Sequence, residues 1–191
     1  MRTSTWVLFM TVSLLGGCGT VDESLPDSGG IGSGGGGDDG GSQTGGDLST
    51  GMPSTVVGTW LSTGTNVAKG LAGPPFSVKS ITGVFKADQT YAVTSTDSTG
   101  KMSTSAGTWT SVPSPVPGIF NLTQMQTQPS SATAQAIYKI DDTANPPVLT
   151  LEGVQTMPSL GATPPTAQGG FGSTVVSGKM TSDWVQTYVR Q

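Results

Sequence analysis

Histidine is absent from this sequence of 191 residues, and cysteine occurs once, as Cys18. Histidine is the commonest general base and the commonest protein ligand of transition metals, so its absence excludes most familiar catalytic and metal sites. A single cysteine cannot form a disulfide within one chain. We therefore predict a protein that is not an enzyme and that has no catalytic residues, metal site or cofactor.

Charged side chains are scarce as well. Asp, Glu, Lys and Arg make up 10% of the residues, and the formal net charge is −4. A nucleic-acid-binding protein normally needs a clustered basic face, so we expect no nucleic-acid partner. Glycine, by contrast, occurs 29 times, and Ser and Thr are abundant. This composition favours a secreted, β-rich protein over a helical one.

The first hydrophobic run is short. Residues 6–15 are apolar except for Thr11 and Ser13, and they follow a segment that contains Arg2 and no acidic residue. Ten helical residues span about 15 Å, roughly half the hydrocarbon core of a bilayer, so this run is too short to cross a membrane. A basic start followed by a short apolar run is typical of a signal segment.

The sequence Leu15-Gly16-Gly17-Cys18 follows directly. It resembles the lipobox of bacterial lipoproteins, and the resemblance implies a signal peptide over residues 1–17 and acyl chains on Cys18 that anchor the protein in a membrane. Gly19 stands where an aspartate would retain the protein in an inner membrane. The resemblance therefore also implies the outer membrane of a bacterial cell envelope. An ordinary signal peptide that happens to contain a cysteine is the alternative.

The composition changes after Cys18. Residues 19–52 include six acidic residues and no basic ones, and Ile31 is the only large apolar residue in the tract SGGIGSGGGGDDGGSQTGGD. Such a segment cannot bury enough surface to offset the entropy that ordering would cost. We therefore predict a disordered linker over residues 18–52, which begins with the lipidated cysteine, and a folded β domain over residues 53–191.

The folded domain has the pattern of successive β-hairpins. Runs rich in Val, Ile, Thr, Tyr, Phe and Trp alternate with clusters of Gly, Pro, Asn and Asp. Residues 173–181 are predicted as a hairpin or a strand, and a short helix capped by Ser182 is the alternative for the last segment. The predicted strands lie within 55–60, 80–85, 90–96, 102–111, 119–126, 134–141, 148–156 and 183–190.

An antiparallel sheet of this size must protect its edges. A sheet of about seven or eight strands does so most simply by closing into an up-and-down β-barrel. We predict an all-β fold of this kind, with a β-sandwich as the competing architecture. No segment after residue 53 shows a helical period over eleven or more residues.

Short motifs on the predicted strands support the barrel. The tripeptide GTW at residues 58–60, which recurs at 107–109, resembles the G-x-W signature of lipocalin-like barrels. The segment GVFKADQTYAV at 83–93 resembles the F-x-x-D-G-T-Y hairpin of bacterial lipocalin-like lipoproteins, with Gln89 in place of the usual glycine. The resemblance covers residues 54–156 and implies a lipocalin-like barrel that holds a small apolar ligand.

Large side chains on these strands are the candidate ligand-binding residues. Trp60 would fill the tapered closed end of a barrel and exclude water. The alternative is that the large side chains pack against one another as a solid core, because an eight-stranded barrel is only just wide enough for one small ligand. The candidates for lining a pocket are Trp60, Phe85, Tyr91, Trp109, Phe120 and Tyr138.

The sequence leaves two functions open. The first is a membrane-anchored envelope lipoprotein whose lipocalin-like domain binds a small apolar ligand. The alternative is a non-catalytic structural or interaction module of the bacterial envelope, which contacts a protein or glycan through its barrel surface or through residues 159–173. A cavity of several hundred Å³ would favour the first, and a filled core with an exposed apolar patch would favour the second. The sequence names no protein partner.

Overall fold

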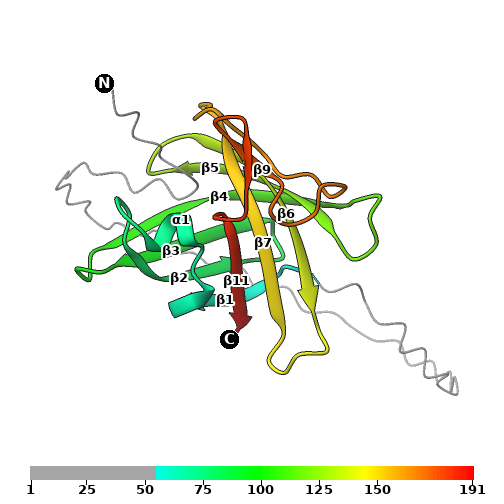
Figure 1. Cartoon of the computed structure of the whole chain (residues 1–191). Helices are drawn as coiled ribbons and strands as arrows, with labels where there is room; N and C mark the ends of the chain where they lie inside the picture. The colour runs from blue at the N-terminus through cyan, green and yellow to red at the C-terminus, as the bar shows by residue number, and fades with distance from the viewer. Residues whose placement is uncertain (1–54) are drawn as a thin grey trace, which may run out of the picture. The chain divides into compact units, whose positions relative to one another are not determined.

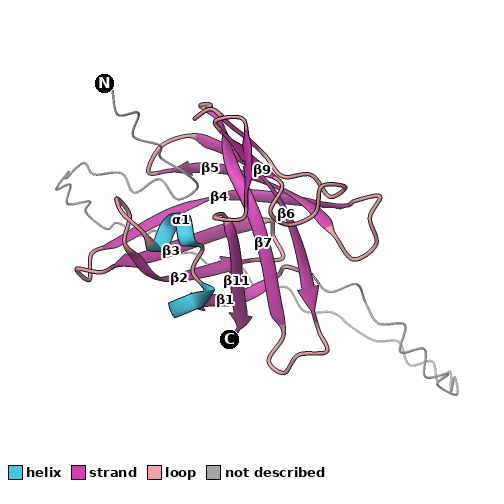
Figure 2. Ribbon diagram, in the orientation of Figure 1, coloured by secondary structure: helices cyan, strands magenta, loops and turns pink. Residues whose placement is uncertain are grey.

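The computed structural model describes residues 55–191 (Figures 1 and 2). The predicted signal peptide over residues 1–17 and the predicted linker over 18–52, with Cys18, lie outside the described residues. Nearly all regular structure in the described part of the chain is β-strand, as predicted from the composition and the short alternating runs. Within residues 55–191, no helix is long and apolar enough to span a membrane.

Eight strands form a closed antiparallel barrel, which confirms the predicted up-and-down architecture over the β-sandwich. Each strand pairs with the next barrel strand along the chain, and the last strand closes the ring by pairing with the first, with Trp60 opposite Arg190. The closed ring leaves no barrel edge unpaired. The barrel strands are β1 (Gly58–Thr63), β2 (Val78–Phe85), β3 (Thr90–Asp97), β4 (Met102–Pro113), β5 (Phe120–Gln128), β6 (Ala132–Asp141), β7 (Val148–Met157) and β11 (Val185–Arg190).

Alternation along each strand sets which side chains enter the barrel. In β3, Tyr91, Val93 and Ser95 are buried, whereas Ala92 and Thr94 between them are only partly buried. This two-residue period is the pattern that predicts the strands from the sequence.

The β3–β4 turn is also fixed by local contacts, because the Asp97 carboxylate accepts hydrogen bonds from the backbone N–H groups of Thr99 and Lys101, at 2.7 and 3.1 Å.

Two insertions interrupt the meander. Between β1 and β2, the 3-10 turn η1 (Gly64–Asn66) and the four-residue helix α1 (Lys69–Ala72) lie at the end of the barrel where β1 ends. Between β7 and β11, a small sheet contains β8 (Ala162–Thr163), β9 (Thr174–Val176) and β10 (Lys179–Thr181). The hairpin predicted over residues 173–181 is confirmed as β9–β10, and the last segment is a strand, not a capped helix.

The opposite end of the barrel is closed by Trp60, whose exposed fraction is 0%. Its indole Nε1 donates a hydrogen bond to the Val56 carbonyl oxygen at 2.7 Å. The Arg190 guanidinium lies 4.6 Å from the centroid of the Trp60 ring and donates to the Thr55 carbonyl oxygen at 3.0 Å. The chain entering β1 and the chain leaving β11 are therefore joined across this end.

Aromatic side chains fill much of the interior beyond Trp60. The Phe85 ring stacks on Tyr91 with centroids 6.0 Å apart and meets Trp109 edge-on at 5.9 Å. The Phe120 ring stacks on Tyr138 at 5.2 Å. Such offset and edge-on pairs add to the stability that their burial provides.

Residues 159–182, here called the strap, cover part of the outer face of β6 and β7, and Figure 1 shows β9 beside β7. Glu152 and Val154 alternate with the inward-facing residues of β7, so they point away from the barrel interior, yet both are fully buried. The Glu152 carboxylate accepts hydrogen bonds from the backbone N–H groups of Gly172, at 2.5 Å, and Thr174, at 3.0 Å. The strap is thus held to the barrel through one buried carboxylate.

Candidate functional site

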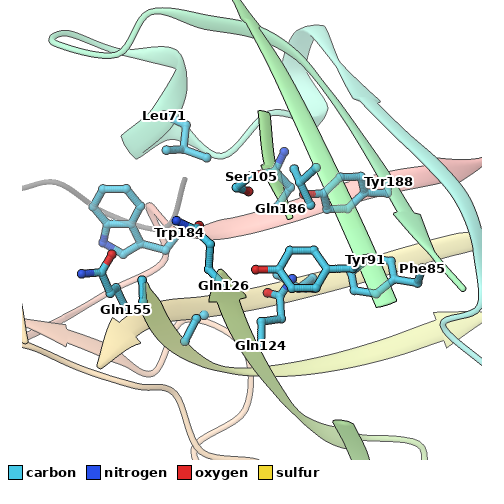
Figure 3. A pocket seen from close by; sticks show the side chains of 16 residues that line it. Leu71, Phe85, Tyr91, Ser105, Gln124, Gln126, Gln155, Trp184, Gln186 and Tyr188 are labelled. Carbon is cyan, nitrogen blue, oxygen red and sulfur yellow. The ribbon is translucent and has the colours of Figure 1, made fainter. Parts of the chain in front are cut away.

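A cavity of about 60 Å³ lies inside the barrel (Figure 3). Its walls are inward-facing positions of seven barrel strands, together with Leu71 of α1 and Trp184 directly before β11. Most of them are apolar, and the polar ones are serine or glutamine. The lining residues are Leu71, Gly83, Phe85, Tyr91, Val93, Ser105, Gln124, Gln126, Ala132, Ala134, Leu151, Gly153, Gln155, Trp184, Gln186 and Tyr188.

Small side chains create this space. Gly83, Ser105, Ala132 and Ala134 occupy inward positions on β2, β4 and β6, where larger residues would reach the middle of the barrel. Protein interiors are otherwise packed as densely as organic crystals, so a gap of this kind reflects the choice of residues around it. Trp60, Trp109 and the Phe120–Tyr138 pair lie outside the cavity lining, and the part of the interior that the cavity occupies is called the open half below.

The cavity opens to solvent beside the start of β6. Ala132 and Ala134 face the interior, yet both are only partly buried, and the half-buried Gln126 lines the same side. Inward-facing side chains can be reached by water in a closed barrel only where the cavity meets the surface.

The helix α1 covers another part of this end. The backbone N–H of Gly70 donates to the Asp183 carbonyl oxygen at 2.8 Å. A side chain at position 70 would clash with the ring of Trp184, so the glycine allows the indole to lie directly against the helix. Leu71 is buried and reaches the cavity from α1. The lid made by α1 and Trp184 therefore depends on close backbone contact at Gly70.

Hydrogen bonding divides the polar lining residues into two groups. Gln155 Nε2 donates to the Pro158 carbonyl oxygen and Gln126 Nε2 donates to the Ser130 carbonyl oxygen, both at 2.9 Å. Gln186 Nε2 and Trp184 Nε1 are buried and have no hydrogen-bond partner. Both belong to the β11 side of the cavity. Because most buried N–H groups in proteins are paired, these two call for a functional explanation.

Charge is absent from the cavity. Among the described residues, none that lines it is Asp, Glu, Lys or Arg. Burial raises the pKa of Tyr91 to about 12, and burial also raises the pKa of Tyr188 above the ordinary value of a tyrosine. Both phenols are therefore neutral at physiological pH. The cavity offers a ligand apolar surface and neutral hydrogen-bonding groups only.

Of the six residues proposed from the sequence, two line the cavity and four do not. Phe85 and Tyr91 line the cavity. Trp60 closes the far end, and Trp109 is packed against Phe85 with its indole Nε1 donating to the Thr90 carbonyl oxygen at 3.2 Å.

Phe120 and Tyr138 also lie outside the cavity lining. They pack together in the core, where the Tyr138 hydroxyl and the Ser111 hydroxyl lie within hydrogen-bonding distance at 2.9 Å. Burial raises the pKa of Tyr138, although the hydrogen bond with Ser111 acts in the opposite direction. These two aromatics therefore support the wall and do not face a ligand.

Sequence reasoning did not identify the glutamines or Trp184 as site residues. Gln186 alternates with Tyr188 on β11 and with Trp184 directly before it, so the period of two places all three on one face. Gln124 shares a face with Leu122 on β5 in the same way. The pattern was present, but a glutamine on a strand is normally an outward-facing residue, and only the closed barrel shows that these face inward.

No protein-family model, curated protein or solved structure matches this chain. Within residues 55–191, no group of three His, Cys, Asp or Glu side chains is placed to hold a metal ion. The case for a function therefore depends on the cavity itself.

Proposed function

We propose that the barrel binds a small, uncharged and largely apolar molecule in its open half. The observation that carries this proposal is a cavity inside a closed barrel, with apolar walls and uncharged polar groups, that reaches solvent at one end and is closed by Trp60 at the other. Apolar walls with a few oriented polar groups are typical of ligand sites. The lipocalin-like motifs at 58–60 and 83–93 support the same function.

The size of the cavity limits the ligand. Sites for drug-sized molecules usually have about 300–1,000 Å³, whereas this cavity has about 60 Å³. We therefore propose either a very small molecule or a larger one of which only the end group enters, with the rest leaving through the opening beside Ala132 and Ala134.

We further propose that the protein is held at the outer membrane of a bacterial cell envelope by acyl chains on Cys18. The support is the lipobox-like sequence at residues 15–18, the preceding signal-like segment and the Gly-rich linker that would hold the barrel away from the bilayer. Intact-mass measurement of the wild-type protein and of Cys18→Ser, both isolated from membranes, tests this anchor. An unmodified wild-type chain would contradict it.

Ligand binding is tested by filling the cavity. We expect native mass spectrometry of the gently purified protein to detect a bound small molecule. Ala134→Phe should remove this molecule, because Ala134 lines the cavity. Gln135→Phe is the matched control, since Gln135 is the next residue of β6 and is exposed. A wild-type protein that binds nothing from a panel of small apolar compounds, or an Ala134→Phe variant that binds as the wild type does, would contradict the proposal.

A second candidate function, contact with a neutral glycan, is favoured by the outer wall. The strands β4 and β5 contain no charged residue, and their exposed side chains include Thr104, Thr108 and Met125. Co-sedimentation with insoluble polysaccharide tests this alternative. Binding that is lost in Thr108→Lys and kept in Ala134→Phe would place the function on the wall instead of in the cavity.

A further inference from the structure

Gln186 has an unmet hydrogen-bond donor inside the cavity. The residue is 3% exposed, it lines the cavity, and its Nε2 has no partner (Figure 3). A buried donor without a partner destabilises the folded protein, because its hydrogen bond with water is lost and not replaced. Its cross-strand partner on β7 is Leu151, which also lines the cavity, so an aliphatic residue would be accommodated here and a glutamine needs a reason.

A second polar group without a partner, the indole N–H of Trp184, is also a hydrogen-bond donor. Trp184 Nε1 is buried without a partner, and an indole N–H can only donate a hydrogen bond. Trp184 also lines the cavity, next to α1. With two unmet donors, the β11 side of the cavity is complementary to a hydrogen-bond acceptor.

The acceptor must be uncharged. A carboxylate or phosphate in this cavity would lose its hydration and gain no cation, because none of the described lining residues is Lys or Arg. The phenols of Tyr91 and Tyr188 are neutral as well, so no counter-charge is available for a cationic ligand. A carbonyl oxygen on an apolar body meets both requirements, since it accepts hydrogen bonds and carries no charge.

We propose that the ligand is an uncharged carbonyl compound whose oxygen accepts a hydrogen bond from Gln186 Nε2. This inference rests on the proposed function and names the class of ligand. Water in the empty cavity would satisfy Gln186 until the ligand arrives, and a carbonyl oxygen can replace that water without leaving the donor unpaired. A hydrocarbon of the same shape cannot do so.

The test uses two probes of the same shape, cyclopentanone and methylenecyclopentane, which differ only in C=O against C=CH₂. Dissociation constants come from titrations followed by tryptophan fluorescence or by NMR. The alkene leaves water more readily than the ketone, so the quantity compared is the ratio of the two affinities in wild type and variant. We expect Gln186→Met to lower the ketone-to-alkene affinity ratio about tenfold, the effect of one hydrogen bond. Gln135→Met, at the exposed outer position of β6, should keep the wild-type ratio.

The possible outcomes distinguish failure of the carbonyl assignment from failure of the proposed ligand-binding function. An unchanged ketone-to-alkene affinity ratio in Gln186→Met overturns the carbonyl assignment and leaves the cavity as a binding site. If neither probe binds and none of the small apolar compounds binds, the proposed ligand-binding function is contradicted as well. A shift of the Gln186 side-chain amide resonance with ketone, and not with alkene, supports the assignment in the wild-type protein even if the variant does not fold.

Discussion

At the residue scale, Gln89 shows how one side chain departs from the conformation that its type prefers. Gln89 lies in the β2–β3 turn with φ of 65°, in the left-handed region. Its backbone N–H donates to the Lys86 carbonyl oxygen at 3.1 Å, and its own carbonyl oxygen accepts from Trp109 N–H at 2.8 Å. These backbone bonds fix the turn whatever side chain is present, so the glutamine carries a conformational cost that glycine would avoid.

We predict that Gln89→Gly stabilises the protein. A left-handed conformation costs a non-glycine residue about 1–2 kcal/mol, and the greater freedom of glycine in the unfolded chain offsets part of this gain. The expected result is a free energy of unfolding higher by about 0.5–1 kcal/mol. Chemical denaturation measures it. Gln135→Gly, at an extended strand position, should destabilise the protein instead, and a loss of stability in both variants would contradict this explanation.

At the element scale, the strap is attached through Glu152 on β7. Both carboxylate oxygens accept backbone hydrogen bonds, from Gly172 and Thr174. Lys139 on β6 adds a contact with the face of the Phe171 ring, at 5.6 Å from its centroid. The segment between β7 and β11 is thus fixed to the barrel wall by a few contacts with the strands beneath it.

We predict that Glu152→Gln loosens the strap while leaving the barrel closed. The amide nitrogen of glutamine would face a backbone N–H that the carboxylate now satisfies. A hydrogen bond to a charged group is worth about 2 kcal/mol, which corresponds to about thirtyfold faster exchange if opening is local. Hydrogen exchange at the Gly172 and Thr174 amides measures this.

Asp142→Asn, at an exposed position of the β6–β7 turn, is the control for a lost carboxylate and should leave the exchange of the strap unchanged. Equal protection of Gly172 and Thr174 in wild type and Glu152→Gln would show that the carboxylate does not hold the strap.

The barrel strands could largely be predicted from the sequence, whereas the covering of the outer face of β7 by the strap could not. The barrel strands follow from alternation and turn residues, which are local properties of the sequence. The strap covers Glu152 and Val154 with residues about twenty positions further along the chain. No local pattern reports such a contact. The helix α1 was also missed, because its four residues are too few to show a helical period.

At the scale of the whole molecule, buried tyrosines make stability depend on alkaline pH. Burial raises the pKa of Tyr91 to about 12 and also raises the pKa values of Tyr138 and Tyr188. The unfolded chain releases these protons near pH 10, before the folded protein does. Stability from these groups is therefore complete below about pH 10 and is lost as the pH rises towards about 12.

We predict a falling midpoint of thermal unfolding between about pH 10 and pH 12. Tyr91→Phe should reduce the slope of this fall, because one of the titrating groups is removed. The two proteins differ in this one group only, so the comparison between wild type and variant isolates the tyrosine. Identical slopes would contradict the assigned cause.

The barrel and a pocket inside it could be anticipated, whereas the residues that line the pocket could be named only in part. All six aromatic candidates proved to be partly or fully buried, but the sequence could not divide them between a packed half and an open half. That division depends on which small residues, such as Gly83 and Ala134, meet across the interior. It also depends on Trp184 reaching the barrel over Gly70, a contact between two distant parts of the chain.

The central claim, that the open half of the barrel is a binding site, is tested most directly by NMR of the tryptophan indole N–H groups during titration with cyclopentanone. Trp184 lines the cavity, whereas Trp60 closes the opposite end. We predict a saturable shift of the Trp184 indole resonance and an unchanged Trp60 resonance. No shift at Trp184 up to the solubility limit of the probe, or equal shifts at both tryptophans, would contradict the claim.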